Sequence, residues 1–187
     1  MQLMMFRPYA PAPNAVFPEG YTVRSMHPGE ETLWSRACIG SFGIDSDSPA
    51  HYFPRMQGIL PEDVLLLTYR DTEIAGTATA QTKDGRSYLH YVAIREEHRG
   101  RGLSHPLCAA VLARHDTLGH ADGCFLTTDD HRLPAIAGYF KLGFLPVLRS
   151  NDALDRWNAV LRTLGKSNVR MLTPEDIDGD TRTCGGE

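Results

Sequence analysis

Apolar and polar residues alternate along the first half of the chain in a way that predicts strands joined by turns. Residues 21–26 alternate as a half-buried strand does, and residues 63–69, 73–81 and 87–94 indicate three further strands separated by short polar turns. After the first strand, residues 30–42 repeat apolar side chains at helical spacing, which predicts a helix. Residues 45–61 are rich in proline, serine and aspartate, and we expect a loop there that faces a substrate.

The second half of the chain shows helical periodicity. Apolar residues from Leu103 onward form the stripe of an amphipathic helix that ends at Gly119, and residues 123–127 predict a strand. A second helix ends at Gly143, a strand follows over residues 144–148, and a last helix ends at Gly165. The stripes of these two helices are Ala135, Ile136, Tyr139 and Phe140, then Leu154, Trp157, Leu161 and Leu164. This order predicts one α/β domain over residues 20–166, with Trp157 in its core.

Both ends of the chain lack such periodicity. Residues 1–19 hold four of the twelve prolines, so we expect an irregular N-terminal arm. Residues 167–187 are acidic and glycine-rich with almost nothing to bury, which predicts a disordered tail. The sequence shows neither an internal repeat nor a linker between two domains.

Composition narrows the function classes. A net charge of −4 gives the chain no global basic field, so we expect no nucleic-acid or membrane partner. The apolar run at the N-terminus is interrupted by Arg7 and Pro8 and is too short for a signal peptide or a membrane span, which predicts a cytoplasmic protein. The cysteines, Cys38, Cys108, Cys124 and Cys184, lack metal-site spacing; we expect no metal, and the first three to be buried and reduced.

The segment 92–104, VAIREEHRGRGLS, joins an apolar strand to a helix start through a charged, glycine-containing turn. Glycines let the backbone approach a ligand closely, and the free N–H groups and dipole of a helix start favour an anion. Arg99 and Arg101 add positive charge that suits phosphate. An ordinary turn with solvated arginines is the alternative. A Walker loop and a dinucleotide fingerprint are excluded, because Leu103 and His105 stand where those motifs need lysine and glycine.

Residues 99–104, Arg99-Gly100-Arg101-Gly102-Leu103-Ser104, resemble the R/Q-x-x-G-x-G/A pyrophosphate loop of the GNAT N-acetyltransferases, with serine in place of the final small residue. The strand Val92-Ala93-Ile94 and the later YFKLGF at 139–144 are similar to the family's strand and its Y-x-x-x-G-F signature. The resemblance implies an α/β (α+β) GNAT fold, a mixed, mostly antiparallel sheet splayed between its fourth and fifth strands and flanked by helices. It also implies that acetyl-CoA lies in the splay, with pantetheine along residues 92–94 and pyrophosphate on residues 99–104.

The resemblance also suggests catalytic groups. Tyr139 matches the tyrosine that serves as general acid in the family, with a core or solvent-facing aromatic as the alternative. Where some members carry a strand glutamate, this chain has Tyr88. By period-two alternation His90 shares a face with Tyr88, Val92 and Ile94, so it is the candidate general base, with a packed strand histidine as the alternative.

Polar residues after the 123–127 strand have two interpretations. Asp129 and Asp130 are suited to capping the next helix, and the alternative is that they bind a cationic amine. Arg132 stands where many family members have an asparagine near the cofactor, so we expect a cofactor contact there. Trp34 belongs either to the core or to an acceptor pocket.

Together these features predict an N-acetyltransferase that moves an acetyl group from acetyl-CoA to a primary amine of a small molecule, by direct attack with Tyr139 as general acid. A protein N-terminal or lysine acceptor is one alternative. A non-catalytic acyl-CoA sensor is another, and an interaction module without cofactor is a third. Whether the protein is a homodimer is left open.

Overall fold

A seven-stranded sheet forms the centre of the computed structural model, which describes residues 1–180. The strands lie in the order β2-β3-β4-β5-β6-β1-β7, and neighbouring strands are antiparallel except for the parallel pair β5 and β6. Their bounds are β1 Leu3–Arg7, β2 Tyr21–Ser25, β3 Val64–Tyr69, β4 Glu73–Lys83, β5 Arg86–Ile94, β6 Cys124–Thr128 and β7 Leu145–Val147. The predicted mixed, mostly antiparallel sheet is therefore confirmed.

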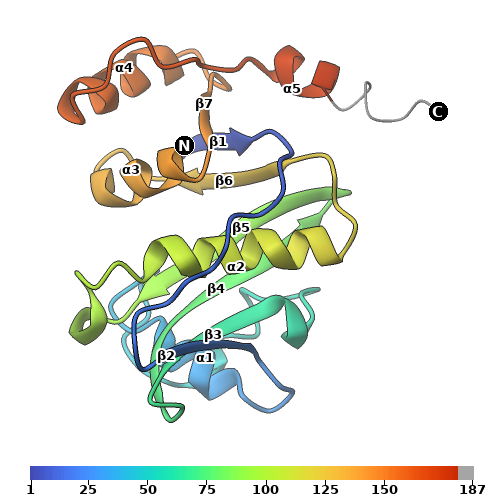
Figure 1. Ribbon diagram of the computed structural model, residues 1–187, viewed down its shortest axis with the longest axis vertical. Coiled ribbons are helices and arrows are strands. Elements are labelled where there is room, and N and C mark those ends of the chain that lie inside the picture. The colour runs from blue at the N-terminus through green and yellow to red at the C-terminus, as the bar shows by residue number, and fades with distance from the viewer. Residues whose placement is uncertain (181–187) are drawn as a thin grey trace.

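The sheet opens between β5 and β6. These strands pair only at Ser87 with Cys124 and at Tyr88 with Phe125, after which β5 runs on to Ile94 without a strand partner on that side. β5 and β6 are the fourth and fifth of the strands predicted from residue 21 onward, so the splay lies where the resemblance implied. Figure 1 shows β6 and α3 diverging from β5 and the start of α2.

Helices cover the sheet. The bounds are α1 Glu31–Ala37, α2 Ser104–Thr117, α3 Leu133–Lys141, α4 Ala153–Thr163 and α5 Pro174–Asp180, with 3₁₀ turns at Pro49–His51, Pro61–Asp63 and Glu96–His98. α2 lies across β4 and β5 (Figure 1) and shares a core cluster with α3 and α4. Trp157 of α4 lies in this cluster, as predicted. α1 buries Trp34 in a second cluster, which decides between the two alternatives for Trp34 in favour of the core.

The prediction of an irregular N-terminal arm is wrong for its first residues. Leu3–Arg7 forms β1, which pairs with both β6 and β7 inside the sheet. A strand covered on both faces has no alternation to signal it, and here Met5 packs in the cluster under α2 while Phe6 packs in the cluster under α5.

The prediction of a disordered tail is also wrong up to residue 180. Leu172 forms a bridge with Val147, and α5 brings Ile177 onto Phe6 and Phe125. Two apolar side chains are a weak sequence signal, yet they cover an apolar patch of the sheet that the rest of the chain leaves open. Residues 181–187, with Cys184, lie outside the described residues.

Candidate active site

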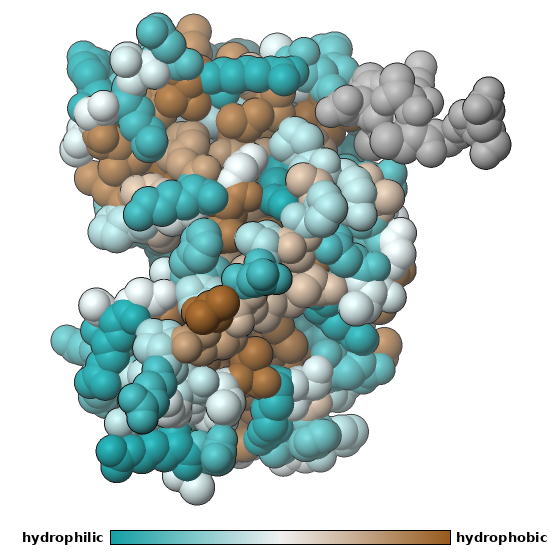
Figure 2. Space-filling view, viewed as in Figure 1, coloured by the Kyte–Doolittle hydropathy of each residue, from teal (hydrophilic) through white to brown (hydrophobic). Residues whose placement is uncertain are grey.

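A cavity of about 700 Å³ occupies the opening between β5 and β6. Its walls come from the loop after α1, the end of β5, the glycine-containing loop, the first turns of α2 and one side of α3. The lining residues are Gly40, Ser41, Phe42, Val92, Ala93, Ile94, His98, Arg99, Gly100, Gly102, Leu103, Ser104, His105, Cys108, Arg132, Pro134, Ala135, Gly138, Tyr139 and Leu142. Figure 2 shows the molecule hollowed at its left edge between its upper and lower halves.

A β-bulge shapes the β5 wall of this cavity. Thr79 pairs with His90 and Thr77 pairs with Ala93, so two residues of β5, Tyr91 and Val92, stand opposite one residue of β4. Tyr91 has a φ of +47°, in the left-handed region that bulky residues rarely adopt. Beyond Tyr88 no strand within residues 1–180 pairs with the edge of β5 that faces β6, which leaves backbone N–H and C=O groups for an extended ligand.

The bulge overturns the expectation that His90 shares a face with Val92 and Ile94. It shifts the side-chain alternation by one residue, so Val92 and Ile94 pack with the cluster under α2, as Leu89 does. His90 instead has its ring 4.0 Å from that of Tyr91, and it does not line the cavity. Burial, followed by the charge of Lys83, lowers the pKa of His90 and favours its neutral form.

The glycine-containing loop is built to receive an anion. Gly100 and Gly102 both have a φ of +75°, a conformation that suits glycine. None of the hydrogen bonds within residues 1–180 uses the N–H groups of residues 100–103, and Ser104 begins α2 directly afterwards. Free amides and the positive end of a helix dipole therefore converge at one end of the cavity.

The two arginines of this loop differ. Arg99 lines the cavity, and its Nε donates to the carbonyl of Ile94 at 3.0 Å. Arg101 does not line the cavity. Its guanidinium donates to the hydroxyl of Tyr21 at 3.0 Å and to the carbonyl of Glu97 at 3.1 Å. Arg101 is thus held against the protein.

Tyr139 lies on the cavity-facing side of α3. Burial raises the pKa of its phenol, the neighbouring Cys108 raises it further, and Arg132 opposes this change. Burial also raises the pKa of the Cys108 thiol to about 12. Both groups therefore stay protonated at neutral pH, and Tyr139 has a proton to give.

A buried arginine anchors the helix that carries Tyr139. Arg7 of β1 is 7% exposed, and its Nε donates to the carbonyl of Leu142 at 2.8 Å, at the end of α3. Its other nitrogens donate to the carbonyls of Ala10 and Pro11. A cation at the end of a helix complements the dipole, so β1 fixes the end of α3.

The acidic pair does not cap α3 through its side chains, contrary to our expectation. Asp129 pairs with Arg132 at 3.1 Å and accepts from Gln2, while Asp130 pairs with Arg156 at 2.5 Å. The helix begins at Leu133 with Arg132 at the N-cap position, and Pro134 in the first turn leaves one N–H group fewer to cap.

Phe42 is one of the cavity residues that the sequence did not predict. Phe42 lies between Gly40 and Gly43 with a φ of +56°, and its ring stands 5.2 Å from that of Tyr91. On its other side the guanidinium carbon of Arg132 is 5.7 Å from the ring centre. The two glycines around an aromatic residue were the available signal, because they permit the turn that brings Phe42 across the opening.

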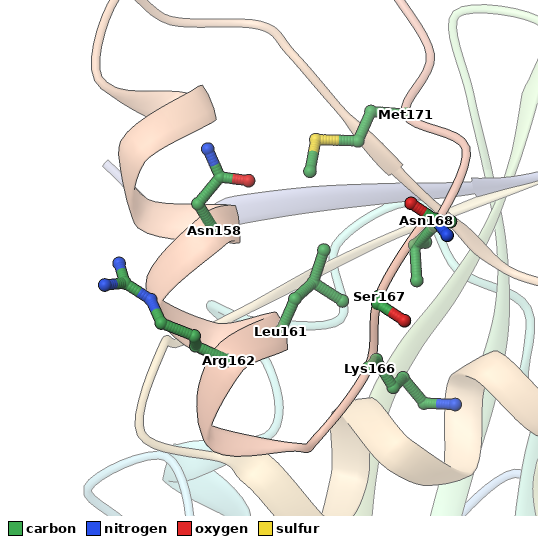
Figure 3. A pocket seen from close by; sticks show the side chains of 8 residues that line it. Asn158, Leu161, Arg162, Lys166, Ser167, Asn168 and Met171 are labelled. Carbon is green, nitrogen blue, oxygen red and sulfur yellow. The ribbon is translucent and has the colours of Figure 1, made fainter.

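A second cavity, of about 530 Å³, lies between α4 and residues 166–171. Figure 3 shows Asn158, Arg162 and Lys166 around it. Its lining residues include no carboxylate, histidine or tyrosine, so it offers no pair of groups for acid–base chemistry. The opening between β5 and β6 is the better candidate.

The sequence model of the Acetyltransferase (GNAT) family matches residues 31–144, a stretch that runs from α1 through the glycine loop and Tyr139 to Phe144. The chain belongs to the GNAT acetyltransferase family. Mycothiol acetyltransferases from Streptomyces bingchenggensis and Corynebacterium aurimucosum are each 31% identical to this chain over the matched parts. The matches cover 75% and 67% of this GNAT chain but 49% and 36% of those proteins, so the chain spans half of their length or less.

Solved structures agree with this assignment. A GCN5-related N-acetyltransferase from Sphaerobacter thermophilus is 27% identical with a TM-score of 0.67, over 78% of this chain and 47% of that one. A GCN5-related N-acetyltransferase from Kribbella flavida, at 22% identity and a TM-score of 0.54, has the same fold over 78% and 54% of the two chains. The expected GNAT fold and family are confirmed. Within residues 1–180 no helix combines the length and apolarity needed to cross a bilayer.

Proposed function

We propose that this chain transfers an acetyl group from acetyl-CoA to the primary amine of a small molecule. The observation that carries the proposal is one cavity in which the glycine loop, the unpaired edge of β5 and Tyr139 come together. An anion site, an extended hydrogen-bonding edge and a proton donor are the features that a pyrophosphate, a pantetheine arm and a thioester require.

Each part of the donor has a place in this scheme. The pyrophosphate accepts hydrogen bonds from the N–H groups of residues 100–104, with Arg99 at its side. The pantetheine amides pair with β5 around Val92, Ala93 and Ile94, as an added strand does. The thioester then lies where the sheet opens, within reach of Tyr139 and bounded by Phe42 and Arg132.

The reaction is direct attack. The amine nitrogen bonds to the thioester carbonyl carbon, and the C–S bond breaks as the tetrahedral intermediate collapses. Tyr139 donates its phenolic proton to the departing sulfur, and its raised pKa keeps that proton in place until the thiolate forms. Solvent then returns a proton to the phenolate.

The amine must be neutral to attack, and His90 is our candidate for the group that first takes the proton from the substrate ammonium. His90 lies beside the bulge but not on the cavity wall, so a water molecule must carry this proton. The second proton that the nitrogen loses as the amide forms goes to solvent. The lowered pKa of His90 keeps it able to accept a proton to lower pH than an ordinary histidine. The rate should therefore fall only as pH drops through that lowered value, and His90→Gln should remove this acidic limb. An unchanged profile would assign the proton to another acceptor.

Two observations favour a small-molecule acceptor. The curated relatives are named mycothiol acetyltransferase, and that name refers to a small molecule and not to a protein. The loop from Gly40 to Phe42 also forms part of the cavity wall, which favours an acceptor small enough to lie within the cavity.

Calorimetry with acetyl-CoA tests the donor site. Gly102→Asp should weaken binding at least about tenfold, because it puts a carboxylate where the pyrophosphate would lie. Gly119→Asp is the matched control, since Gly119 has a φ of +76° at the other end of the same helix and equally open surroundings. Equal affinities of the two variants for acetyl-CoA would contradict the proposed donor site at the glycine-containing loop.

Release of free CoA then tests turnover, using single amines and peptides as acceptors. Amine-dependent release from acetyl-CoA supports the transferase and excludes a binding-only sensor. Binding without release for any amine would favour the sensor, and release with peptides alone would favour a protein acceptor.

A further inference from the structure

A series of hydrogen bonds runs beside the anion-binding loop, from Arg101 through Tyr21 and His98 to Glu73. The His98 side chain is only 4% exposed, and both ring nitrogens have partners. Nδ1 lies 3.0 Å from the hydroxyl of Tyr21, and Nε2 lies 3.2 Å from Oε1 of Glu73. The Tyr21 hydroxyl also receives a hydrogen bond from Nη1 of Arg101 at 3.0 Å.

The chemistry of these groups determines which group donates and which accepts in each hydrogen bond. A guanidinium only donates, so the Tyr21 oxygen accepts from Arg101, and its own O–H is left to donate to Nδ1 of His98. With Nδ1 as acceptor, Nε2–H donates to the carboxylate of Glu73. Both ring nitrogens of His98 then have a partner of the right kind, and the hydrogen bonds run from the Arg101 cation to the Glu73 anion.

This series of hydrogen bonds connects the loop to strands of the sheet that are distant in sequence. Tyr21 begins β2 and Glu73 begins β4, while His98 and Arg101 stand on either side of Gly100. A side chain on Gly100 or Gly102 would point into open space, since no other part of the described chain lies within 4 Å of where it would begin. The anchored residues on either side of Gly100 therefore help to hold the conformation of the loop.

We propose that His98, with Tyr21 and Glu73, is a positioning residue that fixes the glycine loop for the pyrophosphate of the donor. The proposal rests on the proposed function. A flexible loop would lose conformational entropy when the pyrophosphate binds. The hydrogen bonds restrict the loop before binding, so less entropy is lost and the donor binds more tightly. Only a ligand that contacts the loop gains affinity from this restriction.

That specificity separates positioning from a general structural role. CoA carries the pyrophosphate, whereas acetyl-pantetheine contains the thioester arm and ends before it. Loss of these hydrogen bonds should weaken the binding of CoA and leave the use of acetyl-pantetheine unchanged. Damage to the fold would impair both.

The test compares Tyr21→Phe with Tyr69→Phe. Tyr69 is a matched control because its ring lies 4.8 Å from that of Tyr21, yet its hydroxyl makes no hydrogen bond within residues 1–180. We expect Tyr21→Phe to raise the Kd of CoA about tenfold and to change kcat/KM with acetyl-pantetheine less than about twofold. Tyr69→Phe should leave both values as in wild type. Glu73→Gln, whose amide oxygen still accepts from Nε2–H, should retain most of the CoA affinity.

An unaltered Kd for CoA in Tyr21→Phe, or equal losses with CoA and acetyl-pantetheine, would overturn the positioning role alone. Failure of the wild type to bind CoA would overturn the proposed function as well. The two failures are thus distinguished by the wild-type titration.

Discussion

Tyr139 concentrates the chemistry of the proposed reaction in one hydroxyl. Its phenol lies in the cavity, and burial raises its pKa, so the protonated form that a general acid needs persists to higher pH than in an ordinary tyrosine. Tyr139→Phe should lower kcat about 100-fold and leave the Kd of acetyl-CoA within about twofold, because the ring still fills its place.

Measurement of CoA release in a stopped assay, together with calorimetry, checks both values. Tyr88→Phe is the control. It removes the same hydroxyl group from a tyrosine of β5 that does not line the cavity. Full turnover by Tyr139→Phe would leave the thiolate to take its proton from water, and the general-acid assignment would be withdrawn.

At the scale of elements, β4 approaches β5 closely next to the bulge. A side chain on Gly76 would begin 2.4 Å from the carbonyl oxygen of Ala93 and 2.9 Å from Cδ1 of Ile94. Gly76→Ala should therefore displace the part of β5 that lines the cavity and lower the free energy of unfolding by about 1 to 3 kcal/mol.

Urea unfolding measures this change. Gly138→Ala is the matched control, because nothing lies within 4 Å of its added methyl group and alanine favours a helix. The control should be as stable as wild type or slightly more so. A Gly76→Ala variant as stable as wild type would mean that β4 and β5 can move apart at little cost in free energy.

The elements differ in how far the sequence alone could predict them. α2 and the loop before it carry their own signals, since Gly100, Gly102 and the apolar stripe are local features. The bulge at Tyr91 depends on the register between two strands, so a rule of strict alternation placed His90 on the wrong face. β1 escaped prediction because it is buried on both faces, and Phe42 because its contacts with Tyr91 and Arg132 exist only after folding.

At the scale of the whole molecule, the opening that holds the cavity divides the sheet into β2 to β5 on one side and β6, β1 and β7 on the other (Figure 1). Direct pairing across it is confined to two residues of each strand. The contact between Phe42 and Arg132 bridges the two parts at the cavity wall. The part that carries Tyr139 packs with the rest of the sheet in the cluster under α2, and it has a second core on its other face, to which the C-terminal segment contributes.

Ile177 of α5 belongs to that core, with Phe6, Phe125 and Val147, and it is 5% exposed. Ile177→Ala should lower the free energy of unfolding by about 2 to 4 kcal/mol, the cost of emptying a buried aliphatic site. Leu154→Ala is the control, because Leu154 is 49% exposed and should cost less than about 0.5 kcal/mol. Ile177 lies outside the cavity lining, so kcat at low temperature should stay at the wild-type value while the urea midpoint falls. Equal midpoints for the two variants would mean that α5 adds nothing to the core beneath it, whereas a matching fall in kcat would mean that α5 acts on the position of Tyr139 through β1 and β6.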